Sequence, residues 1–297
     1  FAFDDAVGFM GTLMANDNPI VYLNGRFLPL DQAHVSVLDR GFLFADGVYE
    51  VIPVYGGRML RWSEHWQRLE TSLAGIHLPP PLTKDELESV LLQLIHGGHD
   101  QYLYLQVTRG NAGKRDHALP KEYTPTVFAM CSPIGVLPRE TGIKAVVLED
   151  IRWKLCHIKS VALLGNILLR QQAVEQGANE AILVRDGYVT EGAASNVFAL
   201  VGGVLVTPPK GPELLPGITR DLILELAKRN GISAREAALS LDALRSAPEI
   251  WLTSSTREIV PVLALDGQPV GNGRVGAVWQ RMDELYQAFK ARVRSGQ

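Results

Sequence analysis

Short strands joined by two-residue turns recur along the chain, and this pattern constrains the fold more than any other feature. The turn dipeptides are Asn24-Gly25, Gly56-Gly57, Asp186-Gly187 and Gly202-Gly203. Residues that favour strands lie around these turns, and glycine supplies the positive φ angles that hairpin turns require. A regular ladder of strand–helix–strand units contains no such hairpins. The pattern therefore predicts an α+β or α/β fold with many hairpins.

Helices are predicted between these hairpins. The capping box Thr83–Glu86 precedes apolar residues at helical spacing, and this helix is expected to end at Gly97-Gly98. Another helix is predicted to start with Ser63 as its N-cap, because apolar residues follow at spacings of three and four. Further helical segments are predicted over residues 159–176, 217–231 and 275–292.

The chain of 297 residues is about twice the ~150-residue length that is typical of one domain. Prolines are frequent between residues 118 and 139, which favours an interdomain linker at 133–140. We therefore predict a small N-terminal α/β domain over residues 19–132 and a larger C-terminal domain over residues 141–297. Residues 1–18 are expected to be an N-terminal extension or a cloning remnant that belongs to neither domain.

The composition excludes several classes of protein. Hydrophobic residues make up 46% and charged residues 21%, as in folded globular proteins. The net charge is −3 and the basic residues are scattered, so nucleic acid is not an expected partner. Apolar runs fall short of the ~18 residues of a membrane span. Cys131 and Cys156 lie at no metal-binding or redox spacing, which favours a location in the cytoplasm.

Two motifs match known binding sites as strings but lack the necessary context. Residues 271–276 fit the glycine pattern of a dinucleotide-binding loop, yet too little chain follows them for the second strand of that fold. His96 and His99 have the spacing of metal ligands, but they flank two glycines and no third ligand is near them in the sequence. No metal site is therefore predicted.

Three other features carry chemistry when they are taken together. Lys159 precedes an apolar run, where burial would favour a nucleophilic amine. Gly217–Thr219 offers bare backbone amides at the start of a helix, which suits a phosphate group. Glu191 is followed by small residues that allow a planar ligand to approach. Each feature alone also fits a solvated lysine, a hydrated helix end or a surface acid, so the residues by themselves predict only a two-domain enzyme.

In order along the chain, seven segments resemble those of the fold-type IV pyridoxal-phosphate aminotransferases, and among them the bacterial D-amino-acid transaminases. These segments are residues 39–51, 107–110, 149–153, 158–160, 189–192 with 195–198, 217–221 and 253–256. The resemblance runs from about Ile20 to the last helix. It implies a two-domain fold-type IV enzyme, with a small N-terminal domain and a larger domain that binds the cofactor.

The resemblance also implies roles for individual residues around pyridoxal 5′-phosphate. Lys159 matches the lysine that binds the cofactor covalently and transfers the proton. Glu191 matches the acid that faces the pyridine nitrogen and keeps it protonated. Arg68 matches the arginine that binds the phosphate. The further residues implied to bind the cofactor are Ser195, Asn196, Leu215, Ile218, Thr219, Ser254 and Ser255.

Tyr49, Arg115 and His117 match the group that holds the substrate carboxylate in D-amino-acid transaminases. In those enzymes the arginine and histidine come from the partner subunit, so the resemblance implies a homodimer. The loop that carries them is one residue longer here, and Lys114 is a competing cation. Ala193-Ala194 and Ala45 also replace residues that relatives often carry as serines and glycine.

The activity implied is the exchange of an amino group between D-amino acids, such as D-alanine or D-glutamate, and 2-oxo acids, such as pyruvate or 2-oxoglutarate. Three enzymes of the same fold are alternatives: an L-branched-chain aminotransferase, an (R)-amine transaminase and an aminodeoxychorismate lyase. All of them share the lysine and the acid, and they differ in the carboxylate pocket. A binding protein without a cofactor is the alternative outside this class.

Overall fold

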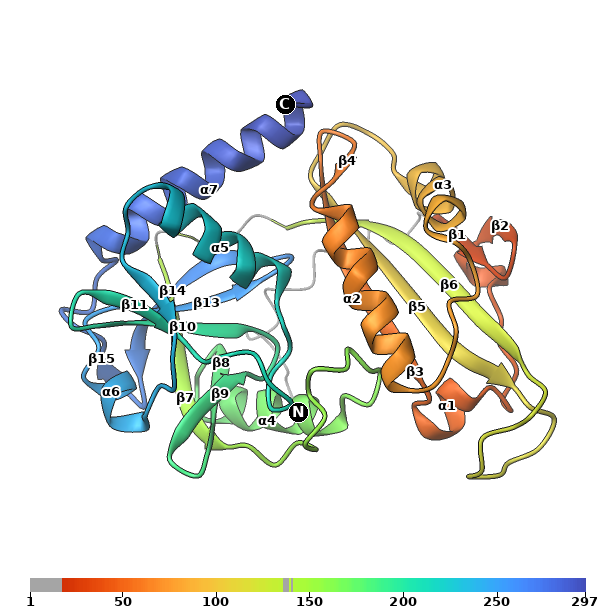
Figure 1. The fold of residues 1–297 in the computed structure, drawn as a ribbon, viewed down its shortest axis with the longest axis horizontal. Helices are drawn as coiled ribbons and strands as arrows, with labels where there is room; N and C mark the ends of the chain where they lie inside the picture. Colours follow the sequence, from red (N-terminus) through yellow and green to blue (C-terminus); the bar gives the residue numbers. More distant parts are fainter. Residues whose placement is uncertain (1–17, 136–138, 140) are drawn as a thin grey trace, which may run out of the picture. The chain divides into compact units, whose positions relative to one another are not determined.

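The computed structural model describes residues 18–135, 139 and 141–297 (Figure 1). These residues form two compact units. The first contains residues 18–135 together with Lys159–Ala162 and Val293–Gln297, and the second contains the remainder of the described chain. The predicted extension lies outside the described residues except for residue 18, and the predicted linker is described only in part. Both units combine a sheet with helices, so the predicted α+β class is confirmed.

Within its described residues, the first unit contains a six-stranded antiparallel sheet in the order β2-β1-β6-β5-β3-β4. The strands are β1 (Ile20–Leu23), β2 (Arg26–Pro29), β3 (Gly47–Tyr55), β4 (Arg58–Met59), β5 (Gln101–Asn111) and β6 (Thr124–Pro133). Asn24 and Gly25 join β1 to β2 with φ angles of 48° and 87°. The first predicted hairpin is therefore confirmed, because both turn residues have the positive φ that this tight turn needs.

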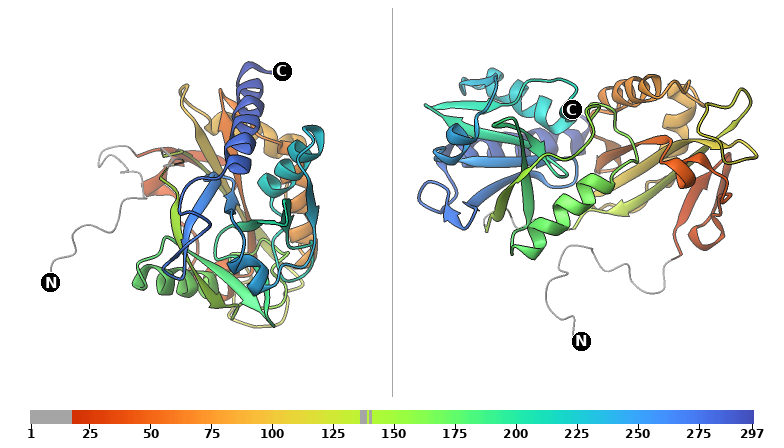
Figure 2. Two further views of the ribbon diagram at one scale, coloured as in Figure 1. Left: turned by 90° about the vertical axis from the view of Figure 1, so that its left-hand side faces the viewer. Right: turned by 90° about the horizontal axis from the view of Figure 1, so that it is seen from below.

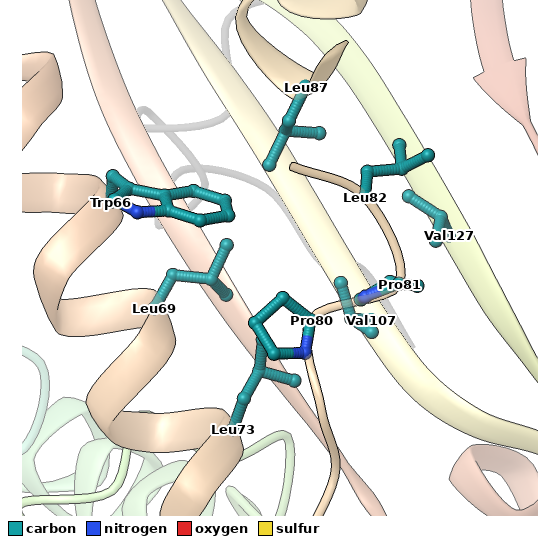
Figure 3. Close-up of a pocket in the computed structure, with 9 residues that line it drawn as sticks. All are labelled: Trp66, Leu69, Leu73, Pro80, Pro81, Leu82, Leu87, Val107 and Val127. Atoms are coloured by element: carbon teal, nitrogen blue, oxygen red, sulfur yellow. The ribbon is translucent and has the colours of Figure 1, made fainter. Parts of the chain in front are cut away.

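Two helices, α2 (Trp62–Gly75) and α3 (Lys84–Leu94), pack on one face of this sheet. Figure 3 shows side chains of α2 pointing toward Leu87 of α3, Val107 of β5 and Val127 of β6 around a small apolar pocket. Leu69 and Leu73 of α2 are fully buried there. Two short elements, η1 (Leu30–Gln32) and α1 (Arg40–Phe44), precede β3.

Of the two N-caps predicted for these helices, one is confirmed and the other is wrong. The Thr83–Glu86 capping box is confirmed, with both reciprocal hydrogen bonds formed, although α3 ends before the predicted glycines. The predicted Ser63 cap is wrong. Arg61 is the N-cap of α2, with a left-handed φ of 51°, and no side chain caps the helix. The chain turns directly from β4 into α2, so the helix begins one residue before Ser63.

Among the described residues, the second unit contains a nine-stranded mixed sheet in the order β12-β11-β10-β13-β14-β7-β8-β9, with β15 paired to β14. Its strands are β7 (Ile143–Glu149), β8 (Glu180–Arg185), β9 (Tyr188–Gly192), β10 (Asn196–Val201), β11 (Val204–Thr207), β12 (Ala234–Glu236), β13 (Ile250–Ser254), β14 (Glu258–Leu265) and β15 (Gln268–Pro269). Its helices are α4 (Leu164–Glu175), α5 (Ile218–Arg229), α6 (Leu241–Arg245) and α7 (Ala277–Ser295). The helix α4 connects the parallel strands β7 and β8.

Both faces of the second sheet are buried, since neighbouring residues on one strand belong to different core clusters. Val197 packs with Ile182 and Leu244, whereas the next residue, Phe198, packs with Trp251 and with apolar side chains of α5 and α7. Figures 1 and 2 show α4 and α5 at different ends of this sheet. No helix in the described part of the chain is long and apolar enough to cross a membrane.

Candidate active site

The residues around Lys159 extend the first sheet instead of forming a helix. Lys159 O accepts a hydrogen bond from Tyr49 N at 2.9 Å, and Val161 N donates to Gly47 O at 3.1 Å. The predicted helix over residues 159–176 is therefore wrong in its first turn, because α4 begins at Leu164. The outer edge of β3 explains the difference: β4 pairs only with its far end, so the edge near Tyr49 accepts another extended segment.

The side-chain amine of Lys159 lies beside an aromatic ring, and no residue that the structure describes forms an ion pair with it. Its Nζ is 4.1 Å from the centroid of the Tyr49 ring, a cation–π distance. No hydrogen bond or ion pair joins Nζ to any residue that the structure describes. The backbone N–H of Lys159 donates to Ser72 Oγ of α2 at 3.1 Å. A half-buried amine that is held in place and left unpaired is suited to act as a nucleophile.

Glu50, the residue after Tyr49, is fully buried and holds the predicted phosphate-binding arginine. Arg68 Nε and Nη2 each donate to a carboxylate oxygen of Glu50 at 2.7 Å, and His65 Nδ1 lies 2.7 Å from the same group. Burial raises the pKa of Glu50, but the charge of Arg68 and these hydrogen bonds outweigh that effect and lower it to about 2. Glu50 therefore stays ionised and fixes the Arg68 guanidinium.

Burial is the main cause that lowers the pKa of His65, and the charges of Arg68 and Lys159 act in the same direction against the effect of Glu50. No role was predicted for Glu50 or His65 from the sequence. The sequence does contain a signal that Glu50 is buried, because alternation along β3 places it on the core face with Val48 and Ile52. A buried carboxylate at such a position requires a cation.

Arg115 and His117 lie together on the loop between β5 and β6, and both side chains are exposed. The Arg115 guanidinium and the His117 ring are each 5.1 Å from the ring centroid of Phe44. No hydrogen bond, ion pair or ring contact among the described residues joins either side chain to Tyr49. One chain therefore brings Arg115 and His117 together but does not connect them with the third member of the predicted group. Lys114, the competing cation, pairs with Asp116 at 3.0 Å.

In the second unit, the buried carboxylate of Glu191 at the end of β9 accepts three hydrogen bonds. The donors are Arg152 Nη1 at 2.5 Å, and Asn196 Nδ2 and Leu215 N at 3.1 Å each. Burial raises the pKa of Glu191 to about 7, although Arg152 and Leu215 act to lower it. A carboxylate has about four acceptor positions, so one remains for a further donor.

Arg152 connects Glu191 to a second acid. Its Nε and Nη2 donate to the two carboxylate oxygens of Asp150 at 2.9 Å each. Burial acts to lower the pKa of Arg152, but the bonds to Asp150 and Glu191 raise it above its usual value, so the guanidinium stays charged. Thr190 Oγ1 donates to Asp150 at 2.8 Å and holds it in turn. Asp150 and Arg152 lie in the matching segment 149–153, but no role was predicted for either of them from the sequence.

The start of α5 is open to an anion. No side chain caps this helix, and the N–H groups of Ile218 and Thr219 precede the first N–H that can bond within it. Gly217 is the N-cap, and a Cβ there would lie 2.0 Å from Asn196 Oδ1. Asn196 Nδ2 also donates to Leu215 O at 2.8 Å. Asn196, Leu215, Ile218 and Thr219 therefore lie together with Glu191, so five of the predicted residues form one group.

The predicted serines lie at the ends of two paired strands, with Ser195 just before β10, Ser254 as the last residue of β13 and Ser255 just after it. Asn196 of β10 is in register with Thr253 of β13, so Ser195 and Ser254 flank a paired position. The Ser195 hydroxyl is buried and has no hydrogen-bond partner among the described residues. Ser254 Oγ accepts a hydrogen bond from Arg257 N at 3.3 Å, and Ser255 is half-buried. These hydroxyls add polar groups to the end of the sheet that carries Glu191.

The comparison with known families gives one match that covers most of the chain. The family model described as amino-transferase class IV matches residues 47–265. The chain belongs to the class IV aminotransferase family. The match begins at β3, which carries Tyr49, and extends through β14, so it includes both Lys159 and Glu191.

Curated and solved members of this family are similar over nearly all of the chain. The D-alanine aminotransferase of Bacillus licheniformis is 41% identical over 90% of this chain and 95% of its own length. The solved branched-chain amino acid aminotransferase of Escherichia coli has a TM-score of 0.86 at 30% identity, and the match covers 92% of this chain and 94% of that one. A second solved branched-chain aminotransferase, that of Thermoproteus uzoniensis with norvaline, has a TM-score of 0.83 at 27% identity with the same coverage.

Proposed function

We propose that this aminotransferase uses pyridoxal 5′-phosphate to exchange amino groups between D-amino acids and 2-oxo acids. The observation that carries the proposal is the Lys159 amine, which lies beside Tyr49 and has no ion pair or hydrogen bond with the described residues. The relative named D-alanine aminotransferase supports the choice of D-amino acids, since it matches at 41% identity. D-alanine and D-glutamate are the proposed amino donors, and pyruvate and 2-oxoglutarate the proposed acceptors.

The donor set of the second unit fits this cofactor. The acceptor position left on Glu191 suits a protonated ring nitrogen, and Arg152 keeps a positive charge next to that carboxylate. The open N–H groups of Ile218 and Thr219 suit a phosphate. Lys159 and Arg68 are also proposed to bind the cofactor. The remaining proposed contacts are Ser195, Asn196, Leu215, Ser254 and Ser255.

When bound, pyridoxal phosphate accepts the amino group and draws electrons away from the substrate α-carbon. The protein supplies the groups that control this chemistry. The Lys159 amine would hold the cofactor covalently, and once the substrate amine has displaced it, this amine would carry the proton that leaves the α-carbon. The Glu191 carboxylate would hold a proton at the ring nitrogen. Tyr49, whose ring lies beside the Lys159 amine, is proposed to donate a hydrogen bond from its hydroxyl to the substrate carboxylate.

We further propose a cytoplasmic homodimer in which Arg115 and His117 of one subunit serve the Tyr49 of the other. Two observations support this arrangement. Arg115 and His117 are exposed and have no contact with Tyr49 within the described chain. Apolar side chains between residues 151 and 168 are also exposed, which is typical of a surface that meets another protein. These side chains are Ile151, Trp153, Leu155, Leu164, Ile167 and Leu168. Free Cys131 and Cys156 agree with a reducing compartment.

The stereochemistry of the substrate tests the proposed function. The cofactor-loaded protein should react with D-alanine and D-leucine much faster than with the corresponding L-amino acids. The measurement is the change in the visible spectrum of the cofactor in a single half-reaction with each of the four amino acids. Faster reaction with L-leucine would replace the proposal with a branched-chain aminotransferase, which the solved relatives also suggest. Absence of any cofactor absorbance would exclude both.

Mixed dimers test whether Arg115 acts from the partner subunit. Arg115→Ala is expected to lower kcat/KM for D-alanine by about 10- to 150-fold, the effect of a lost charge-assisted contact. Lys159→Ala is expected to be inactive. If Arg115 acts in the partner's site, remixing these two variants restores one intact site in each mixed dimer, or about a quarter of the wild-type activity. If it acts within its own chain, no activity returns. Lys114→Ala is the control and should stay active.

A further inference from the structure

Gln106 of β5 lies directly beside the proposed site. The antiparallel register of β3 and β5 pairs Tyr49 with Gln106. Side chains of directly paired residues lie on the same face of a sheet, with Cβ atoms about 4.5–5.5 Å apart. This face is opposite to the one that α2 and α3 cover, because Glu50 and Leu105, the paired neighbours, are fully buried. The Gln106 side chain therefore shares the face of Tyr49, whose ring contacts the Lys159 amine.

A neighbouring tyrosine fixes the orientation of the Gln106 amide. The Tyr104 hydroxyl donates to Gln106 Oε1 at 2.7 Å, and the Tyr104 ring lies 5.8 Å from the Tyr49 ring. Burial, followed by the proximity of Tyr49, raises the pKa of Tyr104 to about 12, so this hydroxyl remains a donor at neutral pH. Since the amide oxygen is occupied, the Nε2 end is the one left to bind a ligand.

The amide nitrogen of Gln106 has donors to offer. Its two N–H groups have no hydrogen-bond partner among the described residues, and the side chain is half-buried. An amide nitrogen donates and cannot accept, so its preferred ligand is an oxygen with lone pairs. The substrate carboxylate supplies such an oxygen, and the proposed function has this carboxylate bind to Tyr49.

We propose that the Gln106 side-chain amide donates a hydrogen bond to the substrate carboxylate, next to Tyr49. Tyr104 is a positioning residue in this arrangement, because it holds the amide oxygen and so turns the amide nitrogen toward the ligand. The inference rests on the proposed function, since it assumes that an amino acid or 2-oxo acid binds on this face. It adds a neutral donor to the site and needs no contribution from a second subunit.

A simple carboxylate ion, propanoate, is the probe for this contact. In Gln106→Leu, the dissociation constant of propanoate is expected to rise about tenfold, since a hydrogen bond to a charged acceptor is lost. The rise should be larger in Gln106→Glu, which removes the donor and adds a like charge. Tyr104→Phe should give a smaller rise, because the amide remains but is no longer oriented. Binding is measured by spectral titration of the cofactor-loaded protein, and KM for D-alanine should rise in parallel.

Two readouts separate this role from a merely structural one. If Gln106 only supported the sheet, Gln106→Leu would lower the thermal midpoint and the affinity for pyridoxal phosphate. The affinity for propanoate would then fall no more than the affinity for pyridoxal phosphate. Under the proposal the thermal midpoint and the affinity for pyridoxal phosphate stay near wild-type values while propanoate binding weakens. Gln93→Leu is the matched control, since Gln93 is exposed on α3 and far along the chain from Tyr49.

The outcomes distinguish this inference from the proposed function. If the wild-type protein reacts with D-alanine and Gln106→Leu binds propanoate as tightly as wild type, the inference is wrong and the proposed function stands. If the wild-type protein reacts with no D-amino acid, the proposed function is wrong and the inference falls with it. An equal loss of propanoate binding in Gln93→Leu would also overturn the assignment to Gln106.

Discussion

Replacing Lys159 with alanine is expected to lower the rate of amino-group transfer by about a thousandfold or more. The change removes the nucleophile and the group that carries the substrate proton in a single step. The Lys159 amine has no ion pair or hydrogen bond within the described chain, so its removal leaves no buried charge without a partner. The thermal midpoint of the cofactor-free protein should therefore change little, which separates lost chemistry from lost folding.

Covalent labelling gives an independent test of Lys159. Borohydride treatment of the cofactor-loaded protein, followed by peptide mapping, should find the cofactor on the peptide that contains Lys159. Lys154→Ala is the matched control, because Lys154 is exposed on the preceding loop, and this variant should be labelled and active. A label on Lys144 or Lys154 would contradict the assignment, as would a Lys159→Ala variant that retains wild-type turnover.

Local sequence signals predicted much of the fold, whereas long-range contacts account for the errors. The Asn24-Gly25 turn and the Thr83–Glu86 capping box each depend on a few adjacent residues, and both are as predicted. The segment at Lys159 has an apolar pattern that suits a helix, but it pairs with β3 because an edge is open there. That edge is formed by residues more than a hundred positions earlier, so no local pattern reports it.

In the candidate site, too, local sequence signals predicted some residues, whereas others become visible only through long-range contacts. Lys159, Glu191 and the helix start at Gly217–Thr219 each stand out by their local chemistry, and the resemblance to a known family supplied their expected roles. Arg152 was not assigned, although it holds the Glu191 carboxylate. The sequence shows a charged residue near a strand end, but it does not show that this charge is buried against two acids. Partners of buried charges become visible only when the contacts are known.

Glu191→Gln is expected to slow transamination by about a hundred- to a thousandfold, the scale of losing one preorganised electrostatic group. An amide at this position cannot hold a proton on the ring nitrogen, so electrons from the substrate carbon are accepted less readily. Affinity for pyridoxal phosphate should change much less, because the open N–H groups at the start of α5 are untouched. The measurements are single half-reaction rates with D-alanine and the dissociation constant of the cofactor.

Glu213→Gln is the matched control for this change. Glu213 also pairs with an arginine of the same region, Arg185 at 3.1 Å, but its side chain is 49% exposed. Losing that charge should leave both turnover and cofactor affinity near wild-type values. If Glu191→Gln turned over as fast as Glu213→Gln, Glu191 could not face the cofactor ring.

The raised pKa of Glu191 adds a signature that does not depend on the cofactor. In the folded protein this pKa is about 7, against 4.5 for an ordinary glutamate, so between these values the folded state binds a proton that the unfolded state has lost. Stability therefore falls as the pH rises through this range. Glu191→Gln has no titrating group at this position and does not lose this stability. The free energy of unfolding of the variant minus that of wild type should therefore rise by on the order of 3 kcal/mol between pH 4.5 and 7.

Unpairing Arg152 in this variant adds a cost, but Arg152 stays charged throughout the range, so that cost does not vary with pH. The pH dependence of the difference thus reports Glu191 alone. Urea unfolding of both cofactor-free proteins at several pH values measures it. A constant difference across the range would mean that Glu191 titrates like an exposed acid, and the buried carboxylate beside Arg152 would no longer explain how a proton is held at the ring nitrogen.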